Sequence, residues 1–308
     1  LDRARARWSR LAQTASPPGL ADFLRAAEAD PATGALLGGI FAGSPFLTEC
    51  LLAEPALFRD VVETGPEAAM ERLMASVTAF EITDRARLMD GLRRDRRRCA
   101  LLVALADLSG RWDLDRVTRA LSTFADAVIG KAVTHLVVEG AARSELALPA
   151  DPEAVARSGI VVLGMGKLGA FELNYSSDID LIVLFDEQRI PYRGQEAPMA
   201  FAVRLARSLA HILEHRTREG YVFRTDLRLR PHLPGHPLAI STDAAELYYE
   251  RHGQNWERAA FIKARAVAGD LLAGQGFLSA LRPYVWRRHL DYAAIRDIHS
   301  IKRQINAH

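Results

Sequence analysis

Cysteine is scarce in this sequence: Cys50 and Cys99 are the only two among 308 residues, far apart and without the spacing of metal ligands. So few thiols argue against a disulfide framework and predict a reducing compartment, the cytoplasm. An excess of one charge is also lacking, because 40 basic and 38 acidic residues leave a formal net charge of +2. We therefore expect no nucleic-acid partner.

Long apolar runs are missing as well. No run approaches the roughly 18 residues that a membrane span needs, and the first residues lack the apolar core of a signal peptide. We therefore expect no membrane partner. The sequence begins without methionine and stops inside a helical pattern at residues 298–307, so we expect a piece of a longer protein.

The first half of the chain predicts a helical bundle. Apolar residues recur every three or four positions through residues 21–148, and no stretch alternates long enough to predict a strand. Pro149 and Pro152 then interrupt any helix, which predicts a domain boundary at residue 150.

The second half mixes strands and helices. Residues 160–163 and 178–185 are apolar runs that predict two buried strands. Residues 221–230 alternate between apolar and mostly charged side chains, which predicts a half-buried strand with a charged face. We therefore predict an α+β fold with a small mixed sheet, preceded and followed by helical segments. The predicted domains are a helical domain over residues 1–150, a catalytic domain over 151–270 and the start of a truncated helical segment over 271–308.

The densest motif is Gly-Met-Gly-Lys-Leu-Gly at residues 164–169, with Asp-Ile-Asp following at residues 178–180. After a strand, and with the acidic Asp186 downstream, this glycine spacing is that of a Rossmann dinucleotide-binding unit, found in nicotinamide and flavin oxidoreductases. That interpretation gives the two aspartates no task, and no further strand–helix–strand units follow. A P-loop is excluded, because Leu168 stands where serine or threonine must follow Lys167.

A second interpretation starts from the pleat of a strand. Residues two apart point to one face, so Asp178 and Asp180 present adjacent carboxylates. Adjacent carboxylates repel each other unless protons or a cation compensate, and Mg²⁺ prefers oxygen ligands. Asp226, on the charged face of the alternating segment, is the third candidate ligand. Three such carboxylates can hold two Mg²⁺ ions, or Mn²⁺ in their place, about 3.5–4 Å apart for phosphoryl or nucleotidyl transfer.

Groups suited to phosphate accompany the three aspartates. A glycine turn lets backbone N–H groups approach phosphate oxygens, and nearby lysine and serine side chains are further donors. Arginines on the alternating segment offer cations that match phosphate geometry. The candidate phosphate-binding residues are Gly166, Lys167, Ser176, Ser177, Arg228 and Arg230.

Other conspicuous side chains favour structural roles. Residues 93–98 contain five arginines, but no aromatic pattern accompanies them, so a solvated helix face is favoured over nucleic-acid binding. Trp256 is expected in the core. Structural ion pairs are expected for Glu257, Arg258, Lys263 and Arg265.

Taken together, these motifs resemble the bifunctional glutamine synthetase adenylyltransferase/adenylyl-removing enzymes. That family carries two similar nucleotidyltransferase domains in tandem: one removes AMP from a tyrosine of glutamine synthetase by phosphorolysis, releasing ADP, and the other attaches AMP from ATP. The resemblance covers residues 160–270 and rests on the glycine motif, Glu172-Leu173-Asn174-Tyr175-Ser176-Ser177-Asp178-Ile179-Asp180, Asp226-Leu227-Arg228-Leu229-Arg230-Pro231 and Trp256-Glu257-Arg258.

The resemblance implies a polymerase-β-like nucleotidyltransferase domain in which Asp178, Asp180 and Asp226 bind the metal ions and carry catalysis. Residues 173–177 and 256–258 are similar to the adenylyl-removing half, in which phosphate attacks the AMP phosphorus and the tyrosine oxygen leaves. Adenylylation of the same tyrosine from ATP stays open, as does a Rossmann oxidoreductase. The implied partners are glutamine synthetase, phosphate, ADP or ATP, and a nitrogen regulatory protein of the PII type.

Overall fold

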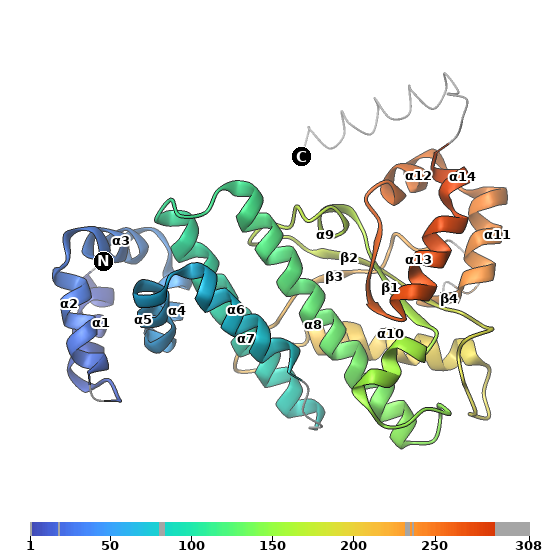
Figure 1. Cartoon of the computed structure of the whole chain (residues 1–308), viewed down its shortest axis with the longest axis horizontal. Coiled ribbons are helices and arrows are strands. Elements are labelled where there is room, and N and C mark those ends of the chain that lie inside the picture. Colours follow the sequence, from blue (N-terminus) through green and yellow to red (C-terminus); the bar gives the residue numbers. More distant parts are fainter. Residues whose placement is uncertain (1, 18, 80–83, 232–234, 236, 287–308) are drawn as a thin grey trace. The chain divides into compact units, whose positions relative to one another are not determined.

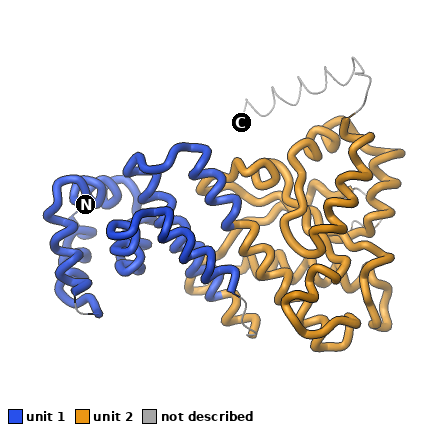
Figure 2. Tube along the Cα trace, viewed as in Figure 1, with its two compact units in different colours: residues 1–79, 90–124 blue, residues 80–89, 125–308 orange. Residues whose placement is uncertain are grey.

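The structure, a computed structural model, describes residues 2–17, 19–79, 84–231, 235 and 237–286. Its internal contacts divide the chain into two compact units, residues 1–79 with 90–124 and residues 80–89 with 125–308 (Figure 2). The long helices α7 (Arg85–Leu108) and α8 (Leu114–Ala142) contribute residues to both units. The domain boundary at residue 150 stays a prediction, and residues 287–308 of the predicted last segment lie outside the described part.

Unit 1 is made of helices, as the periodicity predicts (Figure 1). Four of them begin with proline, which is tolerated at the first position because the N–H there has no helical acceptor. Trp8 is fully buried and contacts the rings of Phe41 and Phe58, with centroids 5.8 and 5.7 Å away. The helices wholly within the unit are α1 (Asp2–Thr14), α2 (Leu20–Ala29), α3 (Pro31–Gly43), α4 (Pro45–Ala53), α5 (Pro55–Thr64) and α6 (Pro66–Thr78).

The arginine side chains at residues 93–98 are less exposed than the sequence predicts. Arg93 is buried, and Arg97 and Arg98 both donate to the buried carboxylate of Glu54 at 3.0 Å. Only Arg94 of the run is fully exposed. The expectation of a solvated helix face is therefore wrong for Arg93, whereas Arg96, Arg97 and Arg98 are half-buried. Glu54, between α4 and α5, draws Arg97 and Arg98 toward the protein.

Unit 2 contains a mixed five-stranded sheet, which confirms the predicted α+β class. The order is β3-β2-β1-β5, and β4 also pairs with β2. Strand β1 runs antiparallel to β2 and β5, whereas β2 runs parallel to β3 and β4. The strands are β1 (Ile160–Gly164), β2 (Ile179–Phe185), β3 (Thr225–Asp226), β4 (Ala239–Ser241) and β5 (Arg265–Gly269).

Two sequence predictions for this unit need correction. The ten-residue alternating segment forms only the two-residue strand β3, because Val222 and Phe223 are buried side by side and their N–H groups donate to the carbonyl of Leu213. Trp256 is 43% exposed instead of buried. Its neighbour Glu257 is buried instead. The Glu257 carboxylate accepts hydrogen bonds from the Tyr248 hydroxyl and from the N–H of Gln254, the N-cap residue of α12.

Helices cover the sheet of unit 2. Val161, Leu163, Ile182 and Leu184 form one core with side chains of α11 to α14, and α10 packs against β2 and β4 (Figure 1). The sheet is consequently buried except near its edges. These helices are α9 (Gly166–Gly169), α10 (Pro198–Glu214), α11 (Thr242–His252), α12 (Asn255–Phe261), α13 (Leu271–Ala280) and α14 (Arg282–Val285), with a 3₁₀ turn at Pro152–Arg157.

Helix α8 is the one helix of the described residues whose length and composition would allow it to cross a membrane. In its most apolar window, 67% of the residues are buried inside the protein. That degree of burial is typical of a core helix, whose apolar faces pack against neighbouring elements.

Candidate active site

The three predicted aspartates meet where β2 and β3 begin to pair. Asp178 immediately precedes β2, Asp180 is its second residue, and Asp226 ends β3. Because β2 and β3 are parallel and in register, Asp180 lies directly opposite Asp226. The N–H of Ile179 donates to the carbonyl of Arg224 at 2.9 Å, which extends this pairing toward Asp178. The structure thus brings together carboxylates that are 46 to 48 residues apart in sequence.

Asp180 has the least favourable electrostatic environment of the three. It is the only residue of β2 that is not fully buried. Burial, followed by the negative charges of Asp226 and Asp178, raises the pKa of the Asp180 carboxyl to about 6. Among the described residues no hydrogen-bond donor is bonded to this carboxylate. A nearby cation would therefore relieve more repulsion at Asp180 than at either neighbour.

The two outer carboxylates have cationic partners. Arg224 donates to Asp178 and, at 2.7 Å, to the carbonyl of Ser176. Arg228 donates to Asp226 through its side chain and through its backbone N–H at 2.8 Å. These hydrogen bonds lower the pKa of Asp226. Both guanidinium groups are largely exposed, so the pairs are open to exchange with solvent or with an incoming anion.

The carboxylate oxygens of the three aspartates are suitable ligands for a divalent cation, but the side chains are not arranged around a common ion position. In the described part of the chain no three carboxylate, imidazole or thiol groups are arranged to hold an ion. Arg224 and Arg228 instead supply positive charge to the outer carboxylates, as a metal would. All three acidic side chains offer oxygen ligands, which Mg²⁺ prefers. The residues therefore offer the ligand atoms that magnesium prefers, with arginine guanidinium groups paired to two of the three carboxylates.

The glycine turn lies against Asp180. The N–H of Met165 donates to the carbonyl of Asp180 at 2.9 Å. Gly166 has a φ of +54°, and a Cβ placed there would lie 2.9 Å from the Asp180 Oδ2 atom. Only glycine fits this close approach without strain. Lys167 is exposed, and its charge lowers the pKa of Asp180, so its ammonium group acts on the same carboxylate.

The remaining predicted residues, Ser176, Ser177 and Arg230, make hydrogen bonds within the loops next to the aspartates. Ser177 donates to the side chain of Asn174 and closes the turn before β2, and Ser176 offers its carbonyl to Arg224. Arg230 donates to the carbonyls of Leu227 and Pro237, although its charge also lowers the pKa of Asp226. Ser177 and Arg230 thus hold loops that border the aspartates.

The sequence predicts an ion pair for Arg265, beside the glycine turn, but it does not identify the partner. Arg265 donates to Asp126 of α8 and to the carbonyls of Leu168 and Gly169. Nothing local marks Asp126 in the sequence, because it is one polar residue of a long amphipathic helix 139 residues away.

The Rossmann alternative is wrong for this fold. A dinucleotide-binding unit needs two parallel strands joined by a long helix. Here β1 and β2 are antiparallel and the connecting helix α9 has four residues. The acidic residue of that motif, Asp186, accepts a hydrogen bond from the N–H of Gln188 in a turn.

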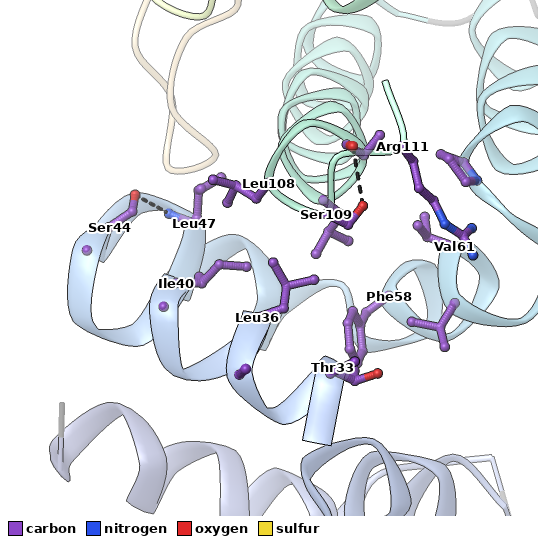
Figure 3. A pocket seen from close by; sticks show the side chains of 18 residues that line it. Thr33, Leu36, Ile40, Ser44, Leu47, Phe58, Val61, Leu108, Ser109 and Arg111 are labelled. Carbon is purple, nitrogen blue, oxygen red and sulfur yellow. Dashed lines mark hydrogen bonds between the residues drawn. The ribbon is translucent and has the colours of Figure 1, made fainter. Parts of the chain in front are cut away.

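Unit 1 contains a separate hollow of about 820 Å³ between α3, α4, α5 and the end of α7 (Figure 3). Its lining includes no acidic residue, histidine or cysteine, and Arg111 is its only charged residue. Ser44 accepts from the N–H of Leu47, and Ser109 donates to the carbonyl of Ala106, so both hydroxyls serve their own helix ends. The described lining of this hollow therefore offers no carboxylate, imidazole or thiol for phosphoryl chemistry.

Comparison with known proteins identifies the family of the chain. Residues 35–280 match the family model described as glutamate-ammonia ligase adenylyltransferase. The chain is 51% identical over 277 residues to the bifunctional glutamine synthetase adenylyltransferase/adenylyl-removing enzyme of Rhizobium meliloti (strain 1021), covering 87% of this chain and 28% of that enzyme. It is 44% identical over 309 residues to the enzyme of the same description from Mesorhizobium japonicum, covering 99% of this chain and 31% of the relative. The chain thus spans under a third of the length of these relatives.

Proposed function

Because the chain belongs to the glutamate-ammonia ligase adenylyltransferase family, we propose that its aspartate site removes AMP from an adenylylated tyrosine of glutamine synthetase. The observation that carries the proposal is the meeting of Asp178, Asp180 and Asp226 where β2 begins to pair with β3, with Asp180 opposite Asp226 and the glycine turn beside them. We further propose that unit 2 contains a polymerase-β-like nucleotidyltransferase domain that acts in the cytoplasm.

The proposed reaction is a phosphorolysis. An oxygen of inorganic phosphate attacks the phosphorus of tyrosine-bound AMP, and the bond from phosphorus to the tyrosine oxygen breaks. The tyrosine oxygen takes up the proton that the phosphate gives up and stays in glutamine synthetase as an unmodified hydroxyl, while ADP is released. Two divalent ions, Mg²⁺ or Mn²⁺, held by the three aspartates would supply charge stabilisation for the transferred phosphoryl group. The fit is supported by the oxygen ligands that all three side chains offer and by the raised pKa of Asp180, which burial and two neighbouring carboxylates cause.

The residues around the aspartates would bind and orient the phosphate groups. Gly166 allows the backbone to approach the phosphate beside Asp180, and Lys167 adds a positive charge on the same side. Arg224 and Arg228 now neutralise Asp178 and Asp226. We propose that both guanidinium groups turn to phosphate oxygens when metal ions bind, because the carboxylates can then exchange one cation for another. Ser176, Ser177 and Arg230 would complete the phosphate-binding set through the loops that they hold.

The direction of the reaction rests on sequence similarity. Residues 173–177 and 256–258 resemble the adenylyl-removing half of the family, whereas the relatives' shared description covers both activities. The same three carboxylates could attach AMP from ATP, since both directions transfer one nucleotidyl group. A PII-type nitrogen regulatory protein is a further proposed partner, through the family alone.

Incubation with defined substrates tests the proposal. Adenylylated glutamine synthetase, phosphate and Mg²⁺ should yield ADP and unmodified enzyme, measured by chromatography and by mass spectrometry of the tyrosine peptide. The Asp226→Asn variant should lose this activity, whereas the Glu187→Gln variant, at an exposed position away from the aspartates, should keep it. ATP-dependent labelling of unmodified glutamine synthetase without ADP release would reverse the direction. Absence of both reactions would overturn the proposal.

A further inference from the structure

Arg265 is the first residue of β5, and its guanidinium group is held by acceptors on two sides. Its Nε donates to the carbonyl of Gly169 at 3.2 Å, and its Nη2 donates to the carbonyl of Leu168 at 3.0 Å. The Nη1 and Nη2 atoms also donate to both oxygens of Asp126, at 2.7 and 2.8 Å. Only 21% of each of these two charged side chains is exposed, so solvent screens this two-pronged pair less than a surface pair.

The aromatic ring of Phe171 lies against the same guanidinium group. The Arg265 Cζ atom is 3.8 Å from the ring centroid, a cation–π contact. Phe171 has a φ of +60°, in the left-handed region that a bulky side chain rarely adopts. The stacked ring and the guanidinium group together favour this strained backbone, because the ring would lose its contact in the relaxed conformation.

The backbone of β5 meets the turn directly next to this side chain. A Cβ placed at Gly169 would lie 1.8 Å from the carbonyl oxygen of Lys263. The backbone of the turn and the backbone of the segment before β5 are therefore in direct contact. The Lys263 ammonium group also pairs with Glu172 at 2.5 Å. Lys263, just before β5, and Arg265, its first residue, therefore both contact the C-terminal part of the turn.

Helix α9 cannot hold this conformation by itself. It has four residues, Gly166–Gly169, and so short a helix is unstable without tertiary contacts. Its N-terminal side is fixed through Met165 and Gly166, which contact Asp180. Its C-terminal carbonyls are fixed by Arg265. These two attachments determine where Gly166 and Lys167 lie relative to the aspartates.

We propose that Arg265, oriented by Asp126, is a positioning residue that sets the glycine turn for phosphate binding beside Asp180. This inference rests on the proposed function for its kinetic consequence, but its structural part does not depend on any substrate. The bonds of Arg265 go to Asp126 and to the carbonyls of Leu168 and Gly169, and to none of the three candidate metal ligands, so its effect passes through the backbone of α9.

The same strand provides a matched control. At its other end Asp270, whose side chain is 1% exposed, accepts from Nε and Nη2 of Arg189 at 3.0 and 2.8 Å. Arg189 resembles Arg265 in charge and in its pairing with an aspartate, but contacts no residue of the glycine turn. Lysine at either position keeps the charge and loses the planar fork, so it cannot bond the aspartate and two carbonyls at once.

Arg265→Lys, Asp126→Asn and Arg189→Lys, each made in the full-length protein, test the inference in two ways. Hydrogen–deuterium exchange of the amides of residues 165–173 should accelerate about tenfold in Arg265→Lys and less in Asp126→Asn, and should not change in Arg189→Lys. The KM for phosphate in AMP removal should rise about tenfold for Arg265→Lys, with a smaller fall in kcat, and stay unchanged for Arg189→Lys. Thermal unfolding measures the general loss of stability for all three.

The outcomes separate this inference from the proposed function. Unchanged exchange at the turn in Arg265→Lys and Asp126→Asn would overturn the positioning role, whatever the activity. Equal effects of Arg265→Lys and Arg189→Lys on the KM for phosphate would also overturn it. A wild-type protein without AMP-removing activity would contradict the proposed function, and the exchange data would then still decide whether Arg265 holds the turn. If Arg265→Lys does not fold, the milder Asp126→Asn variant provides both measurements.

Discussion

Replacing Asp180 with asparagine should stabilise the metal-free protein at neutral pH and abolish nucleotidyl transfer. Burial and the charges of Asp226 and Asp178 raise the pKa of the Asp180 carboxyl from its ordinary value of 3.8 to about 6. A rise of that size corresponds to at most about 3 kcal/mol by which the ionised carboxylate weakens the folded state. Asparagine keeps the shape of the side chain and removes the charge, so the free energy of unfolding should increase by up to this amount.

The gain in stability of Asp180→Asn over wild type should grow as the pH rises. The folded protein binds the Asp180 proton more tightly than the unfolded chain does, since the pKa is raised on folding. The stability that this proton provides is complete below about pH 4 and is lost as the pH rises through about 6. The difference between Asp180→Asn and wild type should therefore be close to zero at about pH 4 and largest above about pH 7.

Urea unfolding after removal of divalent ions measures this difference, at about pH 4, 6 and 8. Added Mg²⁺ should stabilise the wild-type protein at about pH 8 and have little effect on the variant, because the ion binds the ionised carboxylate. Glu187→Gln, an exposed carboxylate away from the site, controls for the loss of one charge and should leave both results unchanged. Equal stability of wild type and Asp180→Asn at about pH 8, or a gain that persists at about pH 4, would refute the reasoning.

Three other changes have defined outcomes. Gly166→Ala should slow AMP removal at least about tenfold and lower the free energy of unfolding by about 1–2 kcal/mol. The reason is that the new Cβ would lie 2.9 Å from the Asp180 Oδ2 atom, at a φ of +54°. Unchanged steady-state kinetics of AMP removal would contradict this prediction. Glu54→Gln should lower the free energy of unfolding by about 1–3 kcal/mol, because two arginines lose their buried counter-charge. Urea unfolding checks this against Arg94→Gln, an exposed arginine of the same helix that should change little. Chelation of divalent ions with EDTA should abolish nucleotidyl transfer and added Mg²⁺ should restore it, so activity that survives chelation would rule out the metal-dependent mechanism.

Local pattern was enough to predict that two carboxylates of the candidate site lie side by side. The period of two in a strand places Asp178 and Asp180 on one face, and this needs no knowledge of the fold. Their meeting with Asp226 depends on β2 and β3 being neighbours, which the resemblance to a known family implied and the strand pairing confirms. The apolar runs likewise predicted β1 and β2 to within one residue.

Contacts between distant segments were not predictable in the same way. The hydrophobic pattern of a strand does not encode the direction of its partner, so the antiparallel pairing of β1 with β2 came only from the structure. The inward position of Glu257 results from the capping box at the start of α12, which turns that side chain toward Tyr248 and leaves Trp256 exposed. Arg265 and Asp126 belong to segments 139 residues apart, and no periodicity links them.

The course of α8 has a mechanical consequence. Asp126 lies two residues beyond Phe124, the last residue that the helix contributes to unit 1. A continuous helix is stiff under torsion, and the stretch from Leu114 to Asp126 measures about 18 Å along its axis. Asp126 is bonded to Arg265 at 2.7 and 2.8 Å, so a rearrangement of α8 that displaced Asp126 would remove the carboxylate that orients Arg265.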